Sequence, residues 1–166
     1  MVDGHQRVSV AREHGQLFID AEVRECSTKV NITPDLKPED LEILGEKVAF
    51  LERTGLDRIR PKARINLTIP DGFCRMLEHI AVHRYFMGLD LHHDISDEEA
   101  VMHWYDKVYK PIVNSIRYSG ILKEFPGKTE GDLYLWVLDR QRYLHAEGQK
   151  LVSPQKAVKD FLEEVR

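Results

Sequence analysis

The chain has 166 residues, a hydrophobic fraction of 42% and a formal net charge of −4 at pH 7. This length and composition suffice for a packed core, which argues against intrinsic disorder, and the acidic balance argues against a general nucleic-acid coat. The two cysteines, Cys26 and Cys74, lack CxxC spacing, and no secretory leader or membrane-length apolar run occurs, so a cytoplasmic protein with both thiols buried is predicted.

The first half of the chain predicts helices that alternate with two strands. Apolar residues spaced three and four apart indicate the helices, and alternation of apolar and polar residues indicates the strands. Asp3 is the predicted N-cap of the first helix, and Gly15 its stop. The elements predicted here are a helix over 5–14, a strand over 17–23, a helix from Pro38 to Gly55, a strand over 63–69, and a helix that follows Pro70-Asp71-Gly72 and ends near Gly88.

The second half predicts helices only. Ser96 and Glu99 have the spacing of a capping box, and they begin a long helix that should kink at Pro111. A threonine and a Ser-Pro pair have the positions of the next two N-caps. The helices predicted here run from Ser96 to Gly120, from Thr129 through Leu138, and from Ser153-Pro154 through Leu162.

These elements together predict an α+β fold that is predominantly helical, with a seam around 89–95. A sheet of only two strands is marginal in water. The strand at 17–23 therefore requires partners, and the most economical source is sequence upstream of Met1.

The turn at the start of the chain is the strongest candidate for a functional site in the sequence. A glycine followed by polar residues at a helix N-terminus presents unpaired N–H groups and the positive end of the helix dipole, which favour an anion such as phosphate. Within Asp3-Gly4-His5-Gln6-Arg7, Arg7 could pair with phosphate oxygens, His5 could move a proton, and Asp3 could act as a base. By spacing alone this evidence is weak, because such a turn is usually only a helix cap.

Residues 2–23 resemble the second half of a ParB-like domain of the ParB/sulfiredoxin superfamily. In that superfamily a strand ends in a turn of the type Asp-Gly-His-His-Arg, a helix packs beneath it, and a strand returns to the sheet. The matching residues here read Val-Asp-Gly-His-Gln-Arg-Val-Ser-Val-Ala-Arg-Glu-His-Gly-Gln-Leu-Phe-Ile-Asp-Ala-Glu-Val.

The resemblance implies a phosphate-bearing ligand, such as CTP, ATP or ADP, at the turn. Gly4, His5, Gln6 and Arg7 match the phosphate- or nucleotide-binding positions, and Asp3 matches the acidic position of the kinase-type turn. Gln6 replaces the second histidine of the His-His form, which keeps hydrogen bonding but removes a titratable group. The strands that precede the turn in the family are absent, so residues 1–88 are predicted to hold an N-terminally truncated ParB-like domain with a helix-strand-helix extension.

The second half of the chain also resembles a known region. The block from His103-Trp104-Tyr105-Asp106 through Phe125-Pro126-Gly127 to Asp132-Leu133-Tyr134-Leu135-Trp136 is similar to the helical region that accompanies ParB-like domains in some bacterial regulators. Residues 96–166 are accordingly predicted to form a helical region. The aromatic residues in this block lie at helical spacings and are expected in the core.

A cluster of basic residues and a group of histidines allow two further interpretations. Arg53, Arg58, Arg60, Lys62 and Arg64 could form a local nucleic-acid patch or a solvated connector. His79 and His83 have a spacing that zinc uses, and Asp90, His92, His93 and Asp94 follow. The order differs from the His-Glu-x-x-His of zinc proteases, so no metal site is predicted and the later run is expected to be a polar turn.

The resemblance implies a ParB-like regulatory protein of transcription or partition type, with a phosphate- or nucleotide-binding turn and an association with DNA. One alternative is a phosphotransferase of the ParB fold, in which His5 or Asp3 handles the proton. A second alternative is a non-catalytic helical interaction module, which an exposed apolar patch would favour. The expected partners are a phosphate-bearing small molecule, DNA, and a second copy of the chain in a homodimer, with no membrane.

Overall fold

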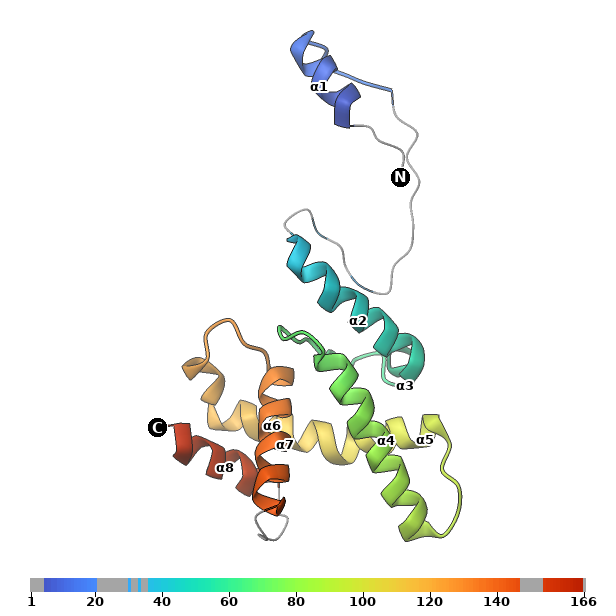
Figure 1. Cartoon of the computed structure of the whole chain (residues 1–166), viewed down its shortest axis with the longest axis vertical. Helices are drawn as coiled ribbons and strands as arrows, with labels where there is room; N and C mark the ends of the chain where they lie inside the picture. Colours follow the sequence, from blue (N-terminus) through green and yellow to red (C-terminus); the bar gives the residue numbers. More distant parts are fainter. Residues whose placement is uncertain (1–4, 21–29, 31–32, 34–35, 147–153, 166) are drawn as a thin grey trace.

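The computed structural model describes residues 5–20, 30, 33, 36–146 and 154–165, and these residues form helices joined by turns and extended segments (Figure 1). The helices described are α1 (His5–Glu13), α2 (Pro38–Thr54), α3 (Leu56–Ile59), α4 (Gly72–Leu91), α5 (Asp97–Trp104), the π-helix η1 (Tyr105–Tyr109), α6 (Lys110–Ser119), the 3-10 helix η2 (Ile121–Glu124), α7 (Glu130–Ala146) and α8 (Pro154–Val165).

The predicted α+β fold is wrong, because the described part of the chain is all-α and contains no strand. Residues 17–20 of the first predicted strand have no regular structure, and Leu17 and Phe18 are 88% and 90% exposed. Residues 21–23 lie outside the described residues. The second predicted strand, 63–69, is a single extended segment without a neighbouring strand.

Apolar and polar residues alternate in the extended segment 63–69 because one side of the segment packs against helices. Ile65 and Leu67 are buried in the helical core, whereas Arg64 and Asn66 are exposed. Side chains replace a sheet ladder: the backbone N–H of Thr68 donates to Asp132 of α7 at 2.8 Å. Alternation of apolar and polar residues therefore indicates an extended segment that is buried on one side. Packed helices can cover that side as well as a second strand can.

The predicted helices are present, with changes at their ends. α1 ends before Gly15, and α2 ends at Gly55, whose φ of 60° suits glycine. The helix predicted to end near Gly88 continues to Leu91. Two short helices, α3 and η2, were not predicted.

The long helix predicted from Ser96 to Gly120 is divided into α5, η1 and α6. Its predicted cap is confirmed, since the backbone N–H of Glu99 donates to the Ser96 hydroxyl at 3.2 Å. The five-residue π-helix lies immediately before α6, whose first turn contains Pro111. Proline has no backbone N–H and cannot donate the hydrogen bond to the fourth residue before it that an α-helix requires. The π turn changes this hydrogen-bond pattern just before Pro111, where a regular α-helix would be disturbed.

The aromatic residues of α5, η1 and α7 form the centre of the core. Trp104, Tyr109 and Tyr134 are at most 4% exposed, and the indole N–H of Trp104 donates to the Tyr134 hydroxyl at 3.0 Å. This confirms the predicted aromatic core for these three residues, whereas Tyr105 and Trp136 are only partly buried. The prediction of buried thiols is wrong for Cys74, which is exposed.

A buried carboxylate locks the extended segment onto the start of α7. Asp132 is fully buried, and its carboxylate accepts from the backbone N–H groups of Thr68 (2.8 Å) and Thr129 (2.7 Å) and from the Thr68 hydroxyl (2.9 Å). The backbone N–H of Asp132 donates in return to the Thr129 hydroxyl at 3.3 Å, which completes a capping box. At Gly131 a Cβ would collide with the carbonyl oxygen of Asn66, so only glycine permits this approach.

Candidate functional site

The predicted phosphate-binding turn is described in part. Asp3 and Gly4 lie outside the described residues, and α1 begins at His5, so Gln6 and Arg7 belong to its first turn. Arg7 is exposed and lines a shallow cavity with Val10, Ala11, Gln16 and Ile19. Segment 16–19 thus folds back beside α1, and the backbone N–H of Gln16 donates to the carbonyl of Ala11 at 2.9 Å.

The five basic residues between 53 and 64 have different partners. Arg53 and Arg58 line a cavity with Asp97 and Glu98. Arg60 donates to Asp106 at 2.5 Å, and this hydrogen bond raises the pKa of the guanidinium and lowers the pKa of the carboxyl. Lys62 and Arg64 are exposed. Acidic side chains therefore accompany Arg53, Arg58 and Arg60, and Arg64 lines a further cavity whose wall includes Asp57.

The histidines that have the spacing of a zinc site do not come together in the structure. His92 and His93 direct Nδ1 toward the carbonyl oxygens of Asp90 and Asp94, so they belong to a polar turn. His83 Nε2 instead lies 2.8 Å from Nδ1 of His103, and the two rings stack at 5.0 Å. Burial, and secondly the neighbouring His103, lower the pKa of His83. No group of three possible metal-ligand side chains is placed to hold an ion in the described ranges.

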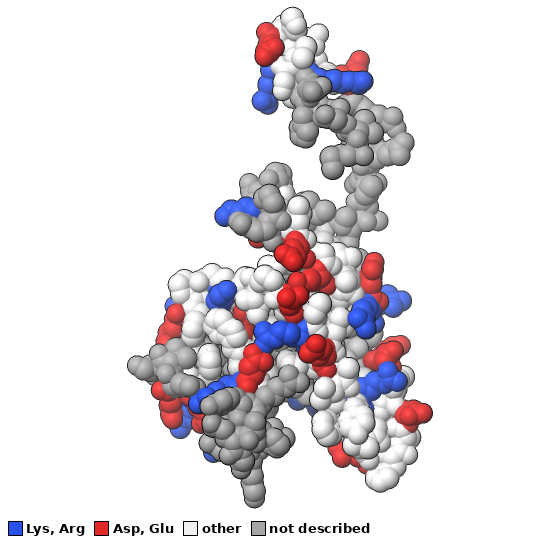
Figure 2. Space-filling view, in the orientation of Figure 1, with Lys and Arg blue, Asp and Glu red and all other residues white. Residues whose placement is uncertain are grey.

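An apolar stripe is exposed on the C-terminal half of α4. Val82, Tyr85, Phe86 and Leu89 are 43%, 63%, 57% and 53% exposed, and we call this set the α4 face. Their spacing of i, i+3, i+4 and i+7 places them on one side of the helix. Figure 2 shows uncharged side chains gathered over this end of α4, at the lower right of the molecule.

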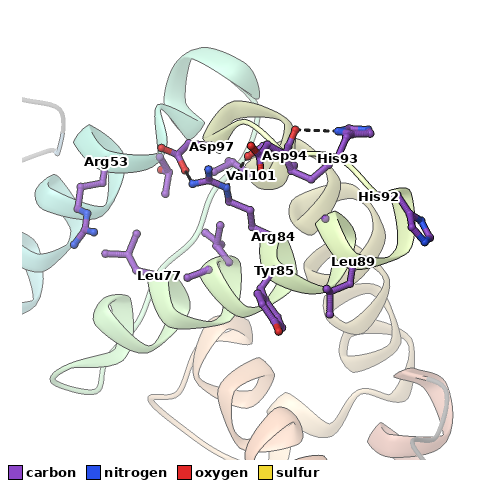
Figure 3. A pocket seen from close by; sticks show the side chains of 15 residues that line it. Arg53, Leu77, Arg84, Tyr85, Leu89, His92, His93, Asp94, Asp97 and Val101 are labelled. Atoms are coloured by element: carbon purple, nitrogen blue, oxygen red, sulfur yellow. Dashed lines mark hydrogen bonds and ion pairs between the residues drawn. The ribbon is translucent and has the colours of Figure 1, made fainter.

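A large open cavity borders one side of the α4 face. Its volume is about 1030 Å³, and it lies between α2, α4, the loop before α5 and α5 itself (Figure 3). Arg84 closes its loop side, where Nε donates to the carbonyl of Ile95 at 2.6 Å and the guanidinium pairs with Asp97. In Figure 3 Tyr85 points away from this pair. The cavity lining combines apolar residues of α4, such as Leu77 and Leu89, with these charged groups.

A smaller and mainly apolar cavity borders the other side. Its volume is about 230 Å³, and both Val82 and Phe86 of the α4 face reach its wall. The α4 face therefore stands as a ridge between two hollows. The remaining lining residues are His79, His83, Trp104, Val108, Tyr134, Leu138 and Gln141.

Sequence reasoning missed the α4 face because it assigned this helix a single apolar side. The helical spacing of Leu77, Ile80, Ala81 and Tyr85 predicts one apolar face made of these residues, yet Ala81 and Tyr85 are exposed. The available signal was that apolar residues occur around the whole helix, which indicates a helix that is covered on more than one side.

No helix among the described residues is long and apolar enough to cross a membrane. Comparison of the chain with protein-family models, with curated proteins and with solved structures finds no match.

Proposed function

We propose that this chain is a non-catalytic regulatory binding protein whose helical body self-associates through the α4 face. The observation that carries this proposal is the exposure of four large apolar side chains on one helix side, flanked by two hollows. Contiguous exposed apolar surface of this kind is typical of binding sites, because leaving it in water is unfavourable.

The pattern of the α4 face favours a second copy as the partner. In an antiparallel pairing of two α4 helices about a twofold axis, Val82 of each copy lies opposite Leu89 of the other, and Tyr85 lies opposite Phe86. The α4 face is thus complementary to itself in apolar character.

The two hollows beside the α4 face support the same pairing. Helices pack by seating the ridges of one in the grooves of the other. A paired copy can seat its own Tyr85 and Phe86 in the hollows of about 1030 Å³ and 230 Å³. The contact area centres on four residues, so a weak dimer in the micromolar range is expected rather than an obligate one.

Sedimentation velocity over a range of protein concentrations tests the self-association. We expect the weight-average mass to rise with concentration, and Phe86→Glu and Leu89→Glu to weaken association at least ~tenfold, because each places a charge in the apolar contact. Tyr118→Glu is the matched control, since Tyr118 is 91% exposed on α6, outside the α4 face. A wild-type chain that is monomeric throughout, or a control variant as defective as Phe86→Glu, would refute this function.

A second candidate function is phosphate or nucleotide binding at the N-terminal turn, as in a ParB-like regulator. The specific observation in its favour is that α1 begins within the turn and has no acidic residue in its first turn to compete with a bound anion. Titration with CTP, ATP, ADP and inorganic phosphate tests it. We expect Arg7→Ala to weaken binding at least ~tenfold, and Arg12→Ala, in the last turn of α1, to have little effect. Absence of binding by all four ligands removes this candidate.

DNA association is the third part of the regulatory proposal, and it rests on the resemblance. Lys62 and Arg64 are exposed members of the basic set, and neither has an ion pair with a carboxylate of the described residues. Phosphate contacts make affinity fall steeply with salt. Retardation of random duplex DNA at several salt concentrations measures this, and a response that is flat, or unaltered by Arg64→Ala, eliminates the basic patch.

A further inference from the structure

Another cavity, separate from the α4 face, lies between α2, α3 and the extended segment that follows them. Its volume is about 530 Å³, which is within the range of small-molecule sites. We call it the α2 cavity. Its lining residues are Val30, Leu44, Lys47, Phe50, Leu51, Leu56, Asp57, Pro61, Ala63, Arg64, Ile65, Asn66 and Phe73.

Two cations occupy one side of the α2 cavity. Lys47 donates from Nζ to Asn66 Oδ1 at 2.7 Å, and Arg64 donates from Nη1 to the carbonyl oxygens of Pro61 (2.7 Å) and Ala63 (2.9 Å). Neither cation has an ion pair with a carboxylate of the described residues. Burial, and secondly the charge of Arg64, lower the pKa of Lys47. The protein thus holds two like charges close together, with Lys47 partly buried and Arg64 exposed.

The polar groups of the α2 cavity are fixed before any ligand binds. The carbonyl oxygen of Asn66 accepts from the Thr129 hydroxyl at 2.6 Å, and Gly131 packs directly against it. Thr68, two residues further along the segment, is held by the carboxylate of Asp132. Asn66 and Arg64 therefore stand on a backbone that the start of α7 holds, so little ordering is required on binding.

We propose that the α2 cavity binds a phosphomonoester with an apolar organic group. The lining holds two cations and one carboxylate, Asp57, so positive charge is in excess and favours an anion. The guanidinium still has Nε and Nη2 free to donate, and Lys47 retains further N–H donors. The amide nitrogen of Asn66 is a further donor, so donors from three residues can meet the phosphate oxygens. Leu44, Leu51 and Ala63 are partly buried apolar residues of the same lining and offer contacts for the organic group.

Isothermal titration of the full chain with phenyl phosphate tests the proposal. We expect Lys47→Met and Arg64→Met each to weaken binding at least ~tenfold, because each removes a charge-assisted contact. Lys62→Met is the matched control: Lys62 is an exposed neighbour that does not line the α2 cavity, and its loss should change affinity less than ~twofold. The ligand-free Lys47→Met chain should melt no lower than wild type, because the substitution relieves repulsion from Arg64.

Further arms distinguish this site from the N-terminal turn and from simple anion binding. Arg7→Ala should leave the affinity for phenyl phosphate unchanged. Inorganic phosphate and phenol should each bind more weakly than phenyl phosphate, since inorganic phosphate lacks the apolar group and phenol lacks the phosphate. Absence of binding up to millimolar phenyl phosphate, equal losses in Lys47→Met, Lys62→Met and Arg7→Ala, or equal affinity for inorganic phosphate would overturn the proposal.

Discussion

Asp132 illustrates how a single residue joins distant parts of this chain. The capping position of Thr129 was predictable, because threonine before an apolar helical run is an N-cap signal. The same carboxylate also accepts hydrogen bonds from the N–H and the hydroxyl of Thr68. This contact could not be predicted, because it links residues 64 positions apart in the sequence. A buried carboxylate is tolerated here because protein donors replace the hydrogen bonds that water would make.

Replacement of Asp132 by asparagine should destabilise the fold by about 3 kcal/mol, because an amide nitrogen would face N–H and O–H donors and leave them unsatisfied in a buried place. Urea denaturation measures the change. Asp139→Asn is the control, since Asp139 is 48% exposed in its ion pair with Arg75 and should cost less than about 1 kcal/mol. Equal effects of the two substitutions would contradict the assigned role of Asp132.

At the scale of elements, helices were predicted well and their surroundings poorly. The start of α5 followed from the Ser96 cap, and the ends of α1 and α2 followed from glycines. The alternation of 63–69 could not reveal whether its partner was a strand or a helix, because both bury every second residue. The sequence likewise could not show which side of α4 stays exposed, because that depends on where α2, α5 and α7 pack.

The junction of α4 and α5 should make stability depend on pH through His83. The folded state lowers the pKa of His83 below its ordinary value of 6.5, chiefly by burial and secondly through His103. Between that lowered pKa and 6.5, the unfolded chain binds a proton that the folded chain does not, so stability falls as the pH drops through this window. No such loss occurs above 6.5, where His83 is neutral in both states.

His83→Gln should therefore reduce the loss of stability between about pH 7.5 and about pH 5.5, as measured by urea midpoints at the two values. The groups that face His83 from the packed elements are His103 of α5 and His79, one turn earlier in α4. His93→Gln is the control, because His93 is exposed in the turn after α4. An unchanged pH dependence in His83→Gln would show that burial of this imidazole has no energetic effect.

At the scale of the whole molecule, the hydrophobic core belongs to the helical body. Its buried cluster extends from Phe50 to Val158 and takes residues from both sides of 89–95. α1 lies away from these packed helices (Figure 1). The turn to which the resemblance assigns a ligand therefore includes the start of α1, outside this cluster, whereas the α4 face and the α2 cavity lie on the body. Composition and periodicity could predict a core, but not those surfaces.

A chain that begins at Leu36 should consequently fold like the complete chain. We expect its thermal midpoint within about 3 °C of the full-length value and an unchanged near-ultraviolet circular dichroism, because the clustered core residues are all retained. The self-association through the α4 face should also persist. Loss of the near-ultraviolet signal on truncation would show that the first residues contribute to the tertiary packing of the body.

The π-helix Tyr105–Tyr109 gives the chain a place where its length can change without a change in packing. A π turn holds one more residue than the α turn it replaces, but both close one full turn. Deletion of Lys107 would therefore favour a regular α turn and leave the orientation of α6 relative to α5 unchanged. Ile112, Val113 and Ile116 would stay in the core. A one-residue deletion in the regular part of α6 would instead turn every later position of that helix by about 100°.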